Sequence, residues 1–234
     1  LNATAALATA AGSNVPVLAL TGQIPSRQIG LGLGIPHELR DQEAALRGVV
    51  PWVELAKTPA QAPTLLADAF RSMLGGRHQP AVFEMAPDIL ARTEDVTLPE
   101  ALDPLPRPMP DPTAVKIAAA LLAGAKRPAI FVGAGAMDAT DALCRFAERL
   151  QAPVIMSRTG KGTISSRHPL AVGMLEGQAM WPDIDVAVIV GTRFLAPALS
   201  WGRTGEVRTI RIDIDAVQAA LPSPADVTLI CHAD

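Results

Sequence analysis

Hydrophobic and polar positions follow two kinds of pattern along this chain. Short, continuous apolar runs that end in glycine or another turn residue are typical of strands buried on both faces of a parallel sheet. Longer segments with apolar residues three and four positions apart are typical of helices packed on such a sheet. The two patterns alternate. They therefore predict an α/β fold with doubly wound, three-layer parallel sheets.

The first ninety residues contain two strand-like runs and three helix-like segments. Strands are expected at Val15–Thr21 (VPVLALT), buried on both faces, and at Ala81–Met85 (AVFEM). Helices are expected at Ala3–Ala11, Asp41–Arg47 and Ala60–Leu74. The order helix, strand, helix, helix, strand is typical of the latter part of an α/β domain.

The alternation is clearer after position 112. Helices are expected at Thr113–Ala123 and Asp138–Leu150, and strands at Pro128–Val132 (PAIFV), Pro153–Met156, Val186–Val190 (VAVIV) and Thr209–Ile214 (TIRIDI). In doubly wound sheets, ligands bind beyond the carboxyl ends of the strands. The loops that follow these strands are therefore the candidate sites.

A proline-rich segment separates the two regions. Its prolines are Pro99, Pro104, Pro106, Pro108, Pro110 and Pro112. Proline lacks the backbone N–H and fixes φ, so neither a helix nor a central strand runs through such a segment. We expect residues 91–112 to be a linker between a unit at 1–90 and a unit at 113–234.

Composition narrows the function classes. Of the 234 residues, 49% are hydrophobic, only 3% are aromatic, and the net charge is -3. This composition excludes wholesale disorder and disfavours nucleic acid and membrane surfaces as partners. No apolar run has the length of a membrane helix, so a soluble, cytoplasmic protein is expected. Cys144 and Cys231 are expected to be buried free thiols, with no metal site. Because the first residue is Leu1 and not Met, we expect a piece of a longer chain.

Three predicted strands end in glycine-bearing loops, at Gly133–Gly135, Ser157–Gly162 (SRTGKG) and Gly191–Arg193. Glycine lets backbone amides approach a phosphate, but it also makes the tight turns of any α/β sheet. Together, the three loops are about equally consistent with a site for a nucleotide-sized ligand and with plain structural turns. Asp213 and Asp215 follow another strand, where a carboxylate accepts hydrogen bonds from ribose hydroxyls or caps the next helix. Both interpretations stay open here.

Many short motifs occur in an order that resembles one enzyme family. They are VPVLALTGQIP (15–25), PAVFEMAPD (80–88), the GAG loop (133–135), GKG (160–162), HPL (168–170), GM (173–174), GTRF (191–194) and IDID (212–215). The chain resembles thiamine-diphosphate-dependent enzymes of the acetolactate (acetohydroxyacid) synthase type, over essentially its whole length. The resemblance implies that residues 1–90 are the C-terminal part of a pyrimidine-binding domain and that 113–234 are a Rossmann-like central domain.

The same resemblance implies a thiamine-diphosphate- and Mg²⁺-dependent decarboxylase or carboligase of a 2-keto acid. The activating glutamate and the Mg²⁺-binding Gly-Asp-Gly motif of this family are expected in segments before and after this chain. We therefore assign no catalytic residue or metal ligand here and expect the chain alone to be inactive. Asn2, His37 and Glu38 are implied on the pyrimidine side. His37, where relatives usually have Gln, and Pro51, where many have Lys, depart from the commonest pattern and leave the substrate open.

In such relatives the central domain holds FAD, as in the synthases, or ADP, as in oxalyl-CoA decarboxylase, or nothing. The residues carried over to a cofactor role here are Gly133, Gly135, Ser157, Gly160, Gly162, Gly173, Met174, Gly191, Arg193, Phe194, Asp213 and Asp215. Glu176 and the apolar segment Leu195–Pro197 depart from the FAD pattern, so an empty site is an equal alternative. The full-length protein is expected to be a homodimer or homotetramer. A non-catalytic, nucleotide-binding Rossmann-like module is the alternative function.

Overall fold

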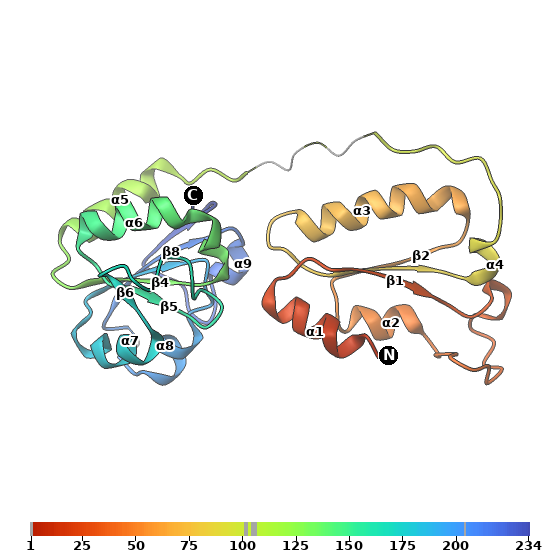
Figure 1. The fold of residues 1–234 in the computed structure, drawn as a ribbon, viewed down its shortest axis with the longest axis horizontal. Helices are drawn as coiled ribbons and strands as arrows, with labels where there is room; N and C mark the ends of the chain where they lie inside the picture. The colour runs from red at the N-terminus through yellow and green to blue at the C-terminus, as the bar shows by residue number, and fades with distance from the viewer. Residues whose placement is uncertain (1, 101–102, 104–106, 204) are drawn as a thin grey trace. The chain divides into compact units, whose positions relative to one another are not determined.

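The chain folds into two compact units, Leu1–Pro106 and Arg107–Asp234. The computed structural model describes residues 2–100, 103, 107–203 and 205–234 (Figure 1). Each unit contains one sheet in which all paired strands are parallel, with helices on both faces. This confirms the predicted α/β class with three-layer, doubly wound sheets.

Unit 1 (residues 2–100 and 103 of the described chain) has a three-stranded sheet in the order β1-β3-β2. The strands are β1 (Leu18–Gly22), β2 (Trp52–Ala56) and β3 (Ala81–Met85). The helices are α1 (Thr4–Ser13), α2 (Gln42–Arg47), α3 (Ala62–Leu74) and α4 (Pro87–Leu90), with 3-10 turns at Ser26–Gln28 and Pro59–Gln61. Helix α3 covers one face, and α1 and α2 cover the other (Figure 1).

Two expectations for unit 1 need correction. Strand β2 was not predicted, and it lies between α2 and α3 in the chain. Strand β1 is not buried on both faces, because Leu20 is 69% exposed. The reason is that α3 packs mainly on β2 and β3 and leaves the far end of β1 uncovered.

Unit 2 (described residues 107–203 and 205–234) has a six-stranded sheet in the order β6-β5-β4-β7-β8-β9. The strands are β4 (Pro128–Val132), β5 (Val154–Met156), β6 (Ala171–Val172), β7 (Val186–Val190), β8 (Arg208–Asp213) and β9 (Val227–Ile230). Counted within the unit, this is the order 3-2-1-4-5-6 of the doubly wound fold. The order in which successive strands are added reverses between the parallel strands β4 and β7, so a crevice for a ligand is expected at the carboxyl ends of these two strands.

Helices cover both faces of this second sheet. They are α5 (Pro112–Ala123), α6 (Thr140–Leu150), α7 (Met174–Met180), α8 (Leu195–Ser200) and α9 (Ala216–Ala219), with 3-10 turns at Ala134–Ala139 and Trp181–Asp183. Figure 1 shows α5 and α6 on one face and α7 and α8 on the other. The strands at 128–132 and 186–190 are confirmed to the residue, whereas β6, β9, α7 and α8 were not predicted.

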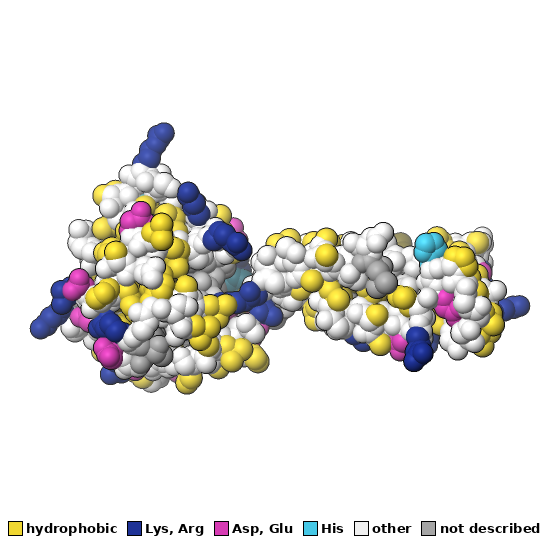
Figure 2. All heavy atoms as spheres, turned by 90° about the horizontal axis from the view of Figure 1, so that it is seen from below, with side chains coloured by type: hydrophobic (Ala, Val, Ile, Leu, Met, Phe, Trp, Pro, Cys, Tyr) yellow, Lys and Arg dark blue, Asp and Glu magenta, His cyan; other side chains and the backbone are white. Residues whose placement is uncertain are grey.

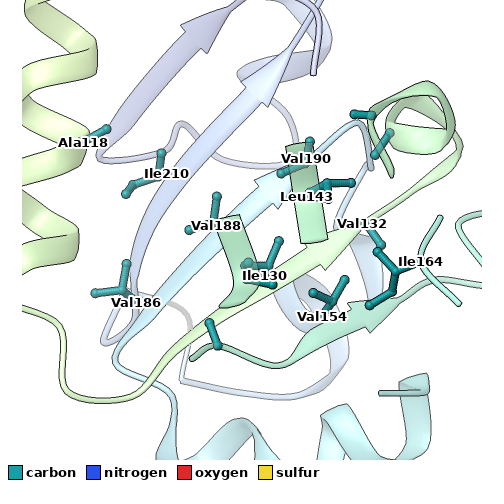
Figure 3. Packing of buried hydrophobic residues seen from close by; sticks show 14 of the residues in the cluster. Ala118, Ile130, Val132, Leu143, Val154, Ile164, Val186, Val188, Val190 and Ile210 are labelled. Atoms are coloured by element: carbon teal, nitrogen blue, oxygen red, sulfur yellow. The ribbon is translucent and has the colours of Figure 1, made fainter. Parts of the chain in front are cut away.

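The core of unit 2 follows the alternation of side chains along its strands (Figure 3). Val186, Val188 and Val190 of β7 face α5 and α6, together with Ile130 of β4. Residues at the intervening positions of β7 face a cluster on the other side that contains Phe131, Trp181 and Phe194. Each fully buried Val or Ile contributes roughly 1.5–3 kcal/mol relative to an exposed one. Burial on both faces therefore explains why β4 and β7 are apolar at every position.

Residues 91–100, 103 and 107–111 of the predicted linker contain no helix or strand, whereas Pro112, its last predicted residue, is the first residue of α5. Residues 101–102 and 104–106 lie outside the described residues, so that part of the prediction is not addressed. Helix α5 begins at Pro112, and the Asp111 carboxylate accepts a hydrogen bond from the Thr113 amide as its cap. Proline in the first turn fits because its missing N–H has no partner there in any case.

Charged side chains of both signs are scattered over the face shown in Figure 2. Among the described residues, no helix is long and apolar enough to cross a membrane. Cys144 and Cys231 are free, but each is only partly buried, so their expected full burial is wrong. Both pack at the rim of the large core cluster of unit 2 and not inside it.

Candidate functional site

The predicted glycine loops meet at the carboxyl edge of the unit 2 sheet. Gly133 follows β4 directly, and Gly191 follows β7, its neighbour in the sheet. Gly135 donates its amide to the Gly191 carbonyl over 3.1 Å. The Ser157–Gly162 loop follows β5, on the other side of β4. The structure therefore brings the three loops together at the point where the strand order reverses.

These positions require glycine because a side chain would clash with neighbouring backbone atoms, and not only because of their backbone conformation. A Cβ atom on Gly133 would lie 2.3 Å from the Gly191 carbonyl oxygen. One on Gly135 would lie 2.9 Å from the Gly191 Cα, and one on Gly160 would lie 2.5 Å from the Val132 carbonyl oxygen. Gly191 in addition has φ of +54°, which side chains disfavour. The loops thus interlock through their main chains.

The amides of these glycines donate to groups within the protein. Gly133 donates to the Val190 carbonyl, Gly191 to the Ile212 carbonyl and Gly160 to the Ser157 carbonyl. With Gly135 also engaged, these four N–H groups are not available to a phosphate. The glycines shape the crevice, and any ligand contact through amide donors must come from other residues of the loops.

Hydroxyl groups hold the Ser157–Gly162 loop in place. The Ser157 Oγ accepts from the Gly160 amide at 3.1 Å. Thr163, which is fully buried, donates its hydroxyl to the Gly160 carbonyl at 2.6 Å. Gly162 has φ of +100° and nothing near its Cβ position, so there the backbone conformation is what requires glycine. Ser157 therefore serves the loop itself.

Met174, Phe194 and Ser157 line a small cavity of about 120 Å³ beside the Gly191 loop. Phe194 is 8% exposed and lies edge-to-face on Phe131, with ring centres 4.9 Å apart. Ligand pockets usually measure roughly 300–1,000 Å³. This cavity is therefore smaller than a usual ligand pocket. Gly173 caps the start of α7 nearby in the chain, with the Glu176 carboxylate folded back toward it.

Arg193 and Asp213 are charged groups at the carboxyl ends of β7 and β8. Arg193 is exposed, and no described carboxylate forms an ion pair with it. Asp213 ends β8 and accepts from the Asp215 amide at 3.1 Å. Burial raises the pKa of the Asp213 carboxyl, against the opposing influence of that amide and of Arg211. Asp215 caps α9 by accepting from the Val217 and Gln218 amides, so the capping alternative is confirmed for this residue.

Arg211 is a buried residue of this region that sequence reasoning missed. It lies on β8, is 2% exposed, and donates to the Thr192 carbonyl at 2.7 Å. The signal was present, because an arginine interrupts the apolar run TIRIDI two positions before Asp213. Its side chain points to the same side of the strand as Asp213, since side chains alternate along β8.

The three residues implied on the pyrimidine side, Asn2, His37 and Glu38, lie in unit 1. Asn2 is exposed in a turn before α1, and His37 is exposed with φ of +71°. The Glu38 carboxylate accepts from the amides of Gly32, Leu33 and Ile35 at 3.0–3.3 Å. These donors, Ile35 foremost, hold the pKa of Glu38 below its usual value. Glu38 therefore organises its own loop, and its contact with a cofactor stays a prediction.

Unit 1 also contains a buried carboxyl that the sequence did not single out. Glu84 lies near the end of the central strand β3 and is 0% exposed. Its Oε1 accepts from the Gln42 side-chain amide at 2.7 Å, and its Oε2 has no partner among the described residues. Burial raises the pKa of Glu84, against the influence of the Gln42 hydrogen bond. No group of three or more His, Cys, Asp or Glu side chains suited to a metal ion occurs in the described part of the chain.

Comparison with known proteins follows this geometry. Residues 115–234 match the family described as thiamine pyrophosphate enzyme, central domain. A probable 2-ketoarginine decarboxylase of Pseudomonas aeruginosa is 33% identical over 92% of this chain and 39% of its own length. A sulfoacetaldehyde acetyltransferase of Rhodobacter capsulatus is 32% identical over 100% of this chain and 40% of its own length. An acetolactate synthase large subunit (isozyme 1) of Escherichia coli is 26% identical over 93% of this chain and 40% of its own length.

The chain thus spans about two fifths of the length of these relatives. The family match covers the whole six-stranded sheet with its glycine loops. The relatives extend over nearly the whole chain and include decarboxylases and synthases. By this match, the chain belongs to the family of thiamine-pyrophosphate-dependent enzymes.

Proposed function

We propose that this chain is part of a thiamine-diphosphate-dependent enzyme that decarboxylates a 2-keto acid or transfers the resulting fragment to a second carbonyl. The observation that carries the proposal is the extent of the relatives' similarity. It runs through unit 1 as well as through the matched central domain. Unit 1 would then be the latter part of the pyrimidine-binding domain, ending in a linker at 91–112. Family membership favours this enzyme over the alternative of a non-catalytic nucleotide-binding module.

The cofactor supplies the electron sink for the carbanion that decarboxylation leaves behind. Mg²⁺ prefers carboxylate and carbonyl oxygens in octahedral geometry beside phosphate oxygens. The described residues offer no cluster of acidic groups for it. As the resemblance implies, the proposal assigns the metal and the cofactor's diphosphate to the family's Gly-Asp-Gly motif, which does not occur in these 234 residues. The contribution of unit 1 would be Asn2 and the His37 loop, which Glu38 holds in shape through three amides.

A turnover assay tests this function. The longer natural protein that contains this chain is mixed with thiamine diphosphate, Mg²⁺ and a panel of 2-keto acids with neutral, basic and aromatic side chains. Release of CO₂ from at least one of them is expected. The 234-residue chain alone, under the same conditions, is expected to show none. Absence of CO₂ release from every member of the panel would contradict the proposed reaction class.

For unit 2, the proposal is a nucleotide with a diphosphate, ADP or FAD, at the carboxyl edge of the sheet. Three observations support it: the crevice that the glycine loops shape at the strand-order reversal, the exposed Arg193 without an ion-pair partner among the described residues, and the partly buried Asp213. Since these four glycine amides donate internally, the phosphates would rely on the Arg193 guanidinium and on amides of other loop residues. Asp213 would accept from a ribose hydroxyl.

Calorimetric titration tests this second site. ADP and FAD are titrated into the wild-type chain and into Arg193→Ala. An arginine hydrogen-bonded to phosphate contributes about 1.5–3 kcal/mol, so the variant should bind roughly 10–150-fold more weakly. Arg149→Ala, which removes an exposed arginine from the end of α6, controls for net charge and should bind as the wild type does. No binding of either nucleotide to the wild type would mean that the loops are inherited architecture without a ligand.

Assembly is the last part of the proposal. The resemblance implies that the full-length protein is a homodimer or homotetramer, because symmetric assembly is the common outcome when subunits share a site. Sedimentation of the full-length protein at micromolar concentration measures this. An active monomer would contradict it.

A further inference from the structure

A buried arginine lies beneath the proposed nucleotide site. Arg211 occupies the fourth position of β8, opposite Ile189 of β7, and is 2% exposed. A buried charge is costly unless it is paired or fully hydrogen-bonded. Among the described residues, no carboxylate lies within ion-pair distance of its guanidinium. The stabilisation of this charge must therefore come from other groups.

Backbone carbonyls provide that stabilisation. One terminal nitrogen, Nη2, donates to the Thr192 carbonyl at 2.7 Å. The other, Nη1, donates to the Leu221 carbonyl and, at 3.4 Å, to the Ala219 carbonyl. These carbonyls belong to two different segments, the loop after β7 and the end of α9. The planar guanidinium thus bridges two segments that are 27 or more residues apart in the chain.

Each segment is connected along the chain to a residue of the proposed nucleotide site. Thr192 lies between Gly191, which interlocks with the Gly133 loop, and the exposed Arg193. Ala219 is the last residue of α9, the helix that Asp215 caps, and α9 follows Asp213 closely. One side chain therefore fixes the spacing between the candidate phosphate ligand and the candidate ribose ligand.

We propose that Arg211 is the positioning residue of this site, which holds the Thr192–Arg193 loop and the α9 segment in one arrangement. The inference rests on the proposed nucleotide function of unit 2. We assign Arg211 a positioning role and not a ligand role, because both of its terminal nitrogens donate to backbone carbonyls; its Nε is buried and has no partner among the described residues. Lysine cannot replace it, since only the rigid fork of arginine reaches two segments at once.

The surroundings of Arg211 permit a chemical-rescue experiment. A cavity of about 400 Å³ lies beside it, on the α7 and α8 face of the sheet. Its polar wall includes Thr209 and Asp226, and its apolar wall includes Trp181 and Pro197. In Arg211→Ala the space vacated by the side chain would join this cavity. Free guanidinium ion at low millimolar concentration, far below denaturing levels, could then occupy the vacated place and bridge the same carbonyls.

The first measurement needs no nucleotide. Amide hydrogen exchange is followed in segments 191–198 and 214–222 of the wild type, Arg211→Met, Arg211→Lys and Arg208→Met. Arg208 is the matched control, an exposed arginine on the same strand that pairs with Asp226 at 2.7 Å. Exchange in both segments should accelerate together, roughly ten-fold or more, in Arg211→Met and Arg211→Lys and remain unchanged in Arg208→Met. Unchanged exchange in both Arg211 variants would overturn the proposal.

The second measurement is ADP affinity by calorimetry, below the melting temperature of every variant. Arg211→Met, Arg211→Lys and Arg211→Ala should bind roughly 10–100-fold more weakly than the wild type, and guanidinium should restore a part of the loss in Arg211→Ala only. A purely structural arginine would lower thermal stability without changing the affinity of the folded protein, and that result would contradict a positioning role. If the wild type binds neither ADP nor FAD, the nucleotide function fails, while hydrogen exchange still decides whether Arg211 joins the two segments.

Discussion

The loops at the carboxyl edge of each sheet are held in place by different interactions in the two units. In unit 2, the loops after β4, β5 and β7 interlock through backbone contacts at Gly133, Gly160 and Gly191. In unit 1, the loop after β1 is held by a side chain, because the Glu38 carboxylate accepts from three amides. The glycines of that loop, Gly30, Gly32 and Gly34, all have positive φ and nothing within 4 Å of a Cβ position.

This difference shows that glycine-bearing loops arise for two physical reasons. In unit 1 glycine provides a backbone conformation that side chains disfavour, and space is plentiful. In unit 2 glycine permits main chains to touch. Of the four glycines in close contact, Gly133, Gly135 and Gly160 do not have positive φ, whereas Gly191 does. A glycine loop after a strand is therefore not evidence of a phosphate site until the destination of its amides is known. The following variants test how far the two edges differ.

The largest effect is expected for Gly133→Ala in unit 2. The new methyl group would lie 2.3 Å from the Gly191 carbonyl oxygen and 2.6 Å from the Thr192 Cβ, so the backbone must move. We expect the free energy of unfolding to fall by about 3 kcal/mol or more, measured by urea denaturation. Gly12→Ala in α1, where nothing lies within 4 Å, should be neutral or should stabilise by about 0.5–1 kcal/mol. Equal stability of Gly133→Ala and the wild type would show that the loops do not interlock.

The next effect is expected for Gln42→Ala in unit 1. Gln42 donates to the buried Glu84 carboxyl at 2.7 Å and to the Gly22 carbonyl at 3.0 Å. Its loss leaves a buried acceptor without a partner, which costs about 1–3 kcal/mol of unfolding free energy. Gln61→Ala removes an exposed glutamine that accepts from the Lys57 amide, and it should cost less than about 0.5 kcal/mol. Equal costs for the two variants would mean that the edge of unit 1 does not depend on this side-chain bond.

A pH-dependent effect is expected for Glu84→Gln. Burial raises the pKa of Glu84 above its ordinary value near 4.5, with Asp41 and Glu43 acting in the same direction and Arg47 opposing them. The folded protein therefore keeps a proton that the unfolded chain has lost, and the free energy of unfolding falls as the pH rises from about 4.5 through the folded-state pKa. The glutamine variant cannot ionise, so its stability relative to the wild type should rise over this window and then level off.

Urea denaturation at a series of pH values from 4 to 8 measures this difference. Glu94→Gln, at an exposed position of the same unit, provides the control and should follow the wild-type profile. Parallel profiles for Glu84→Gln and the wild type would show that Glu84 reaches water in the folded protein.

The smallest effect is expected for Gly32→Ala in unit 1. At φ of +67° alanine must adopt the left-handed backbone conformation, which costs about 1 kcal/mol of conformational free energy. The added methyl group has no atom within 4 Å. The change should stay local, so limited proteolysis should find faster cleavage near residues 29–37 without a shift of the main unfolding transition. Gly22→Ala, at a position without positive φ and without neighbours, should leave the cleavage rate unchanged. A fall in the free energy of unfolding as large as that of Gly133→Ala would contradict the distinction between the two edges.

The sequence predicted the inner strands well and the outer ones poorly. The runs at 128–132 and 186–190 are apolar throughout, and 81–85 is apolar except for the buried Glu84, because both faces of the sheet are covered there, and that pattern is local. Strand β2 (WVELA) contains Glu54, and β6 has two residues, so neither has a pattern of its own. Pairing with β3 and β5 makes them strands, and such pairing depends on residues distant in the chain.

Site residues divide in the same manner. The sequence by itself determined where the candidate loops lie, since parallel strands bring their carboxyl ends to one edge, and it gave a helix cap as one of two open interpretations of Asp215. Only the tertiary structure decided that the glycine amides are engaged, that Glu38 binds its own loop, and that Arg211 bridges Thr192 to the end of α9. The physical reason is that hydrogen bonds and close backbone contacts join groups far apart in sequence. A local pattern shows that a residue type is present, but the fold fixes its partner.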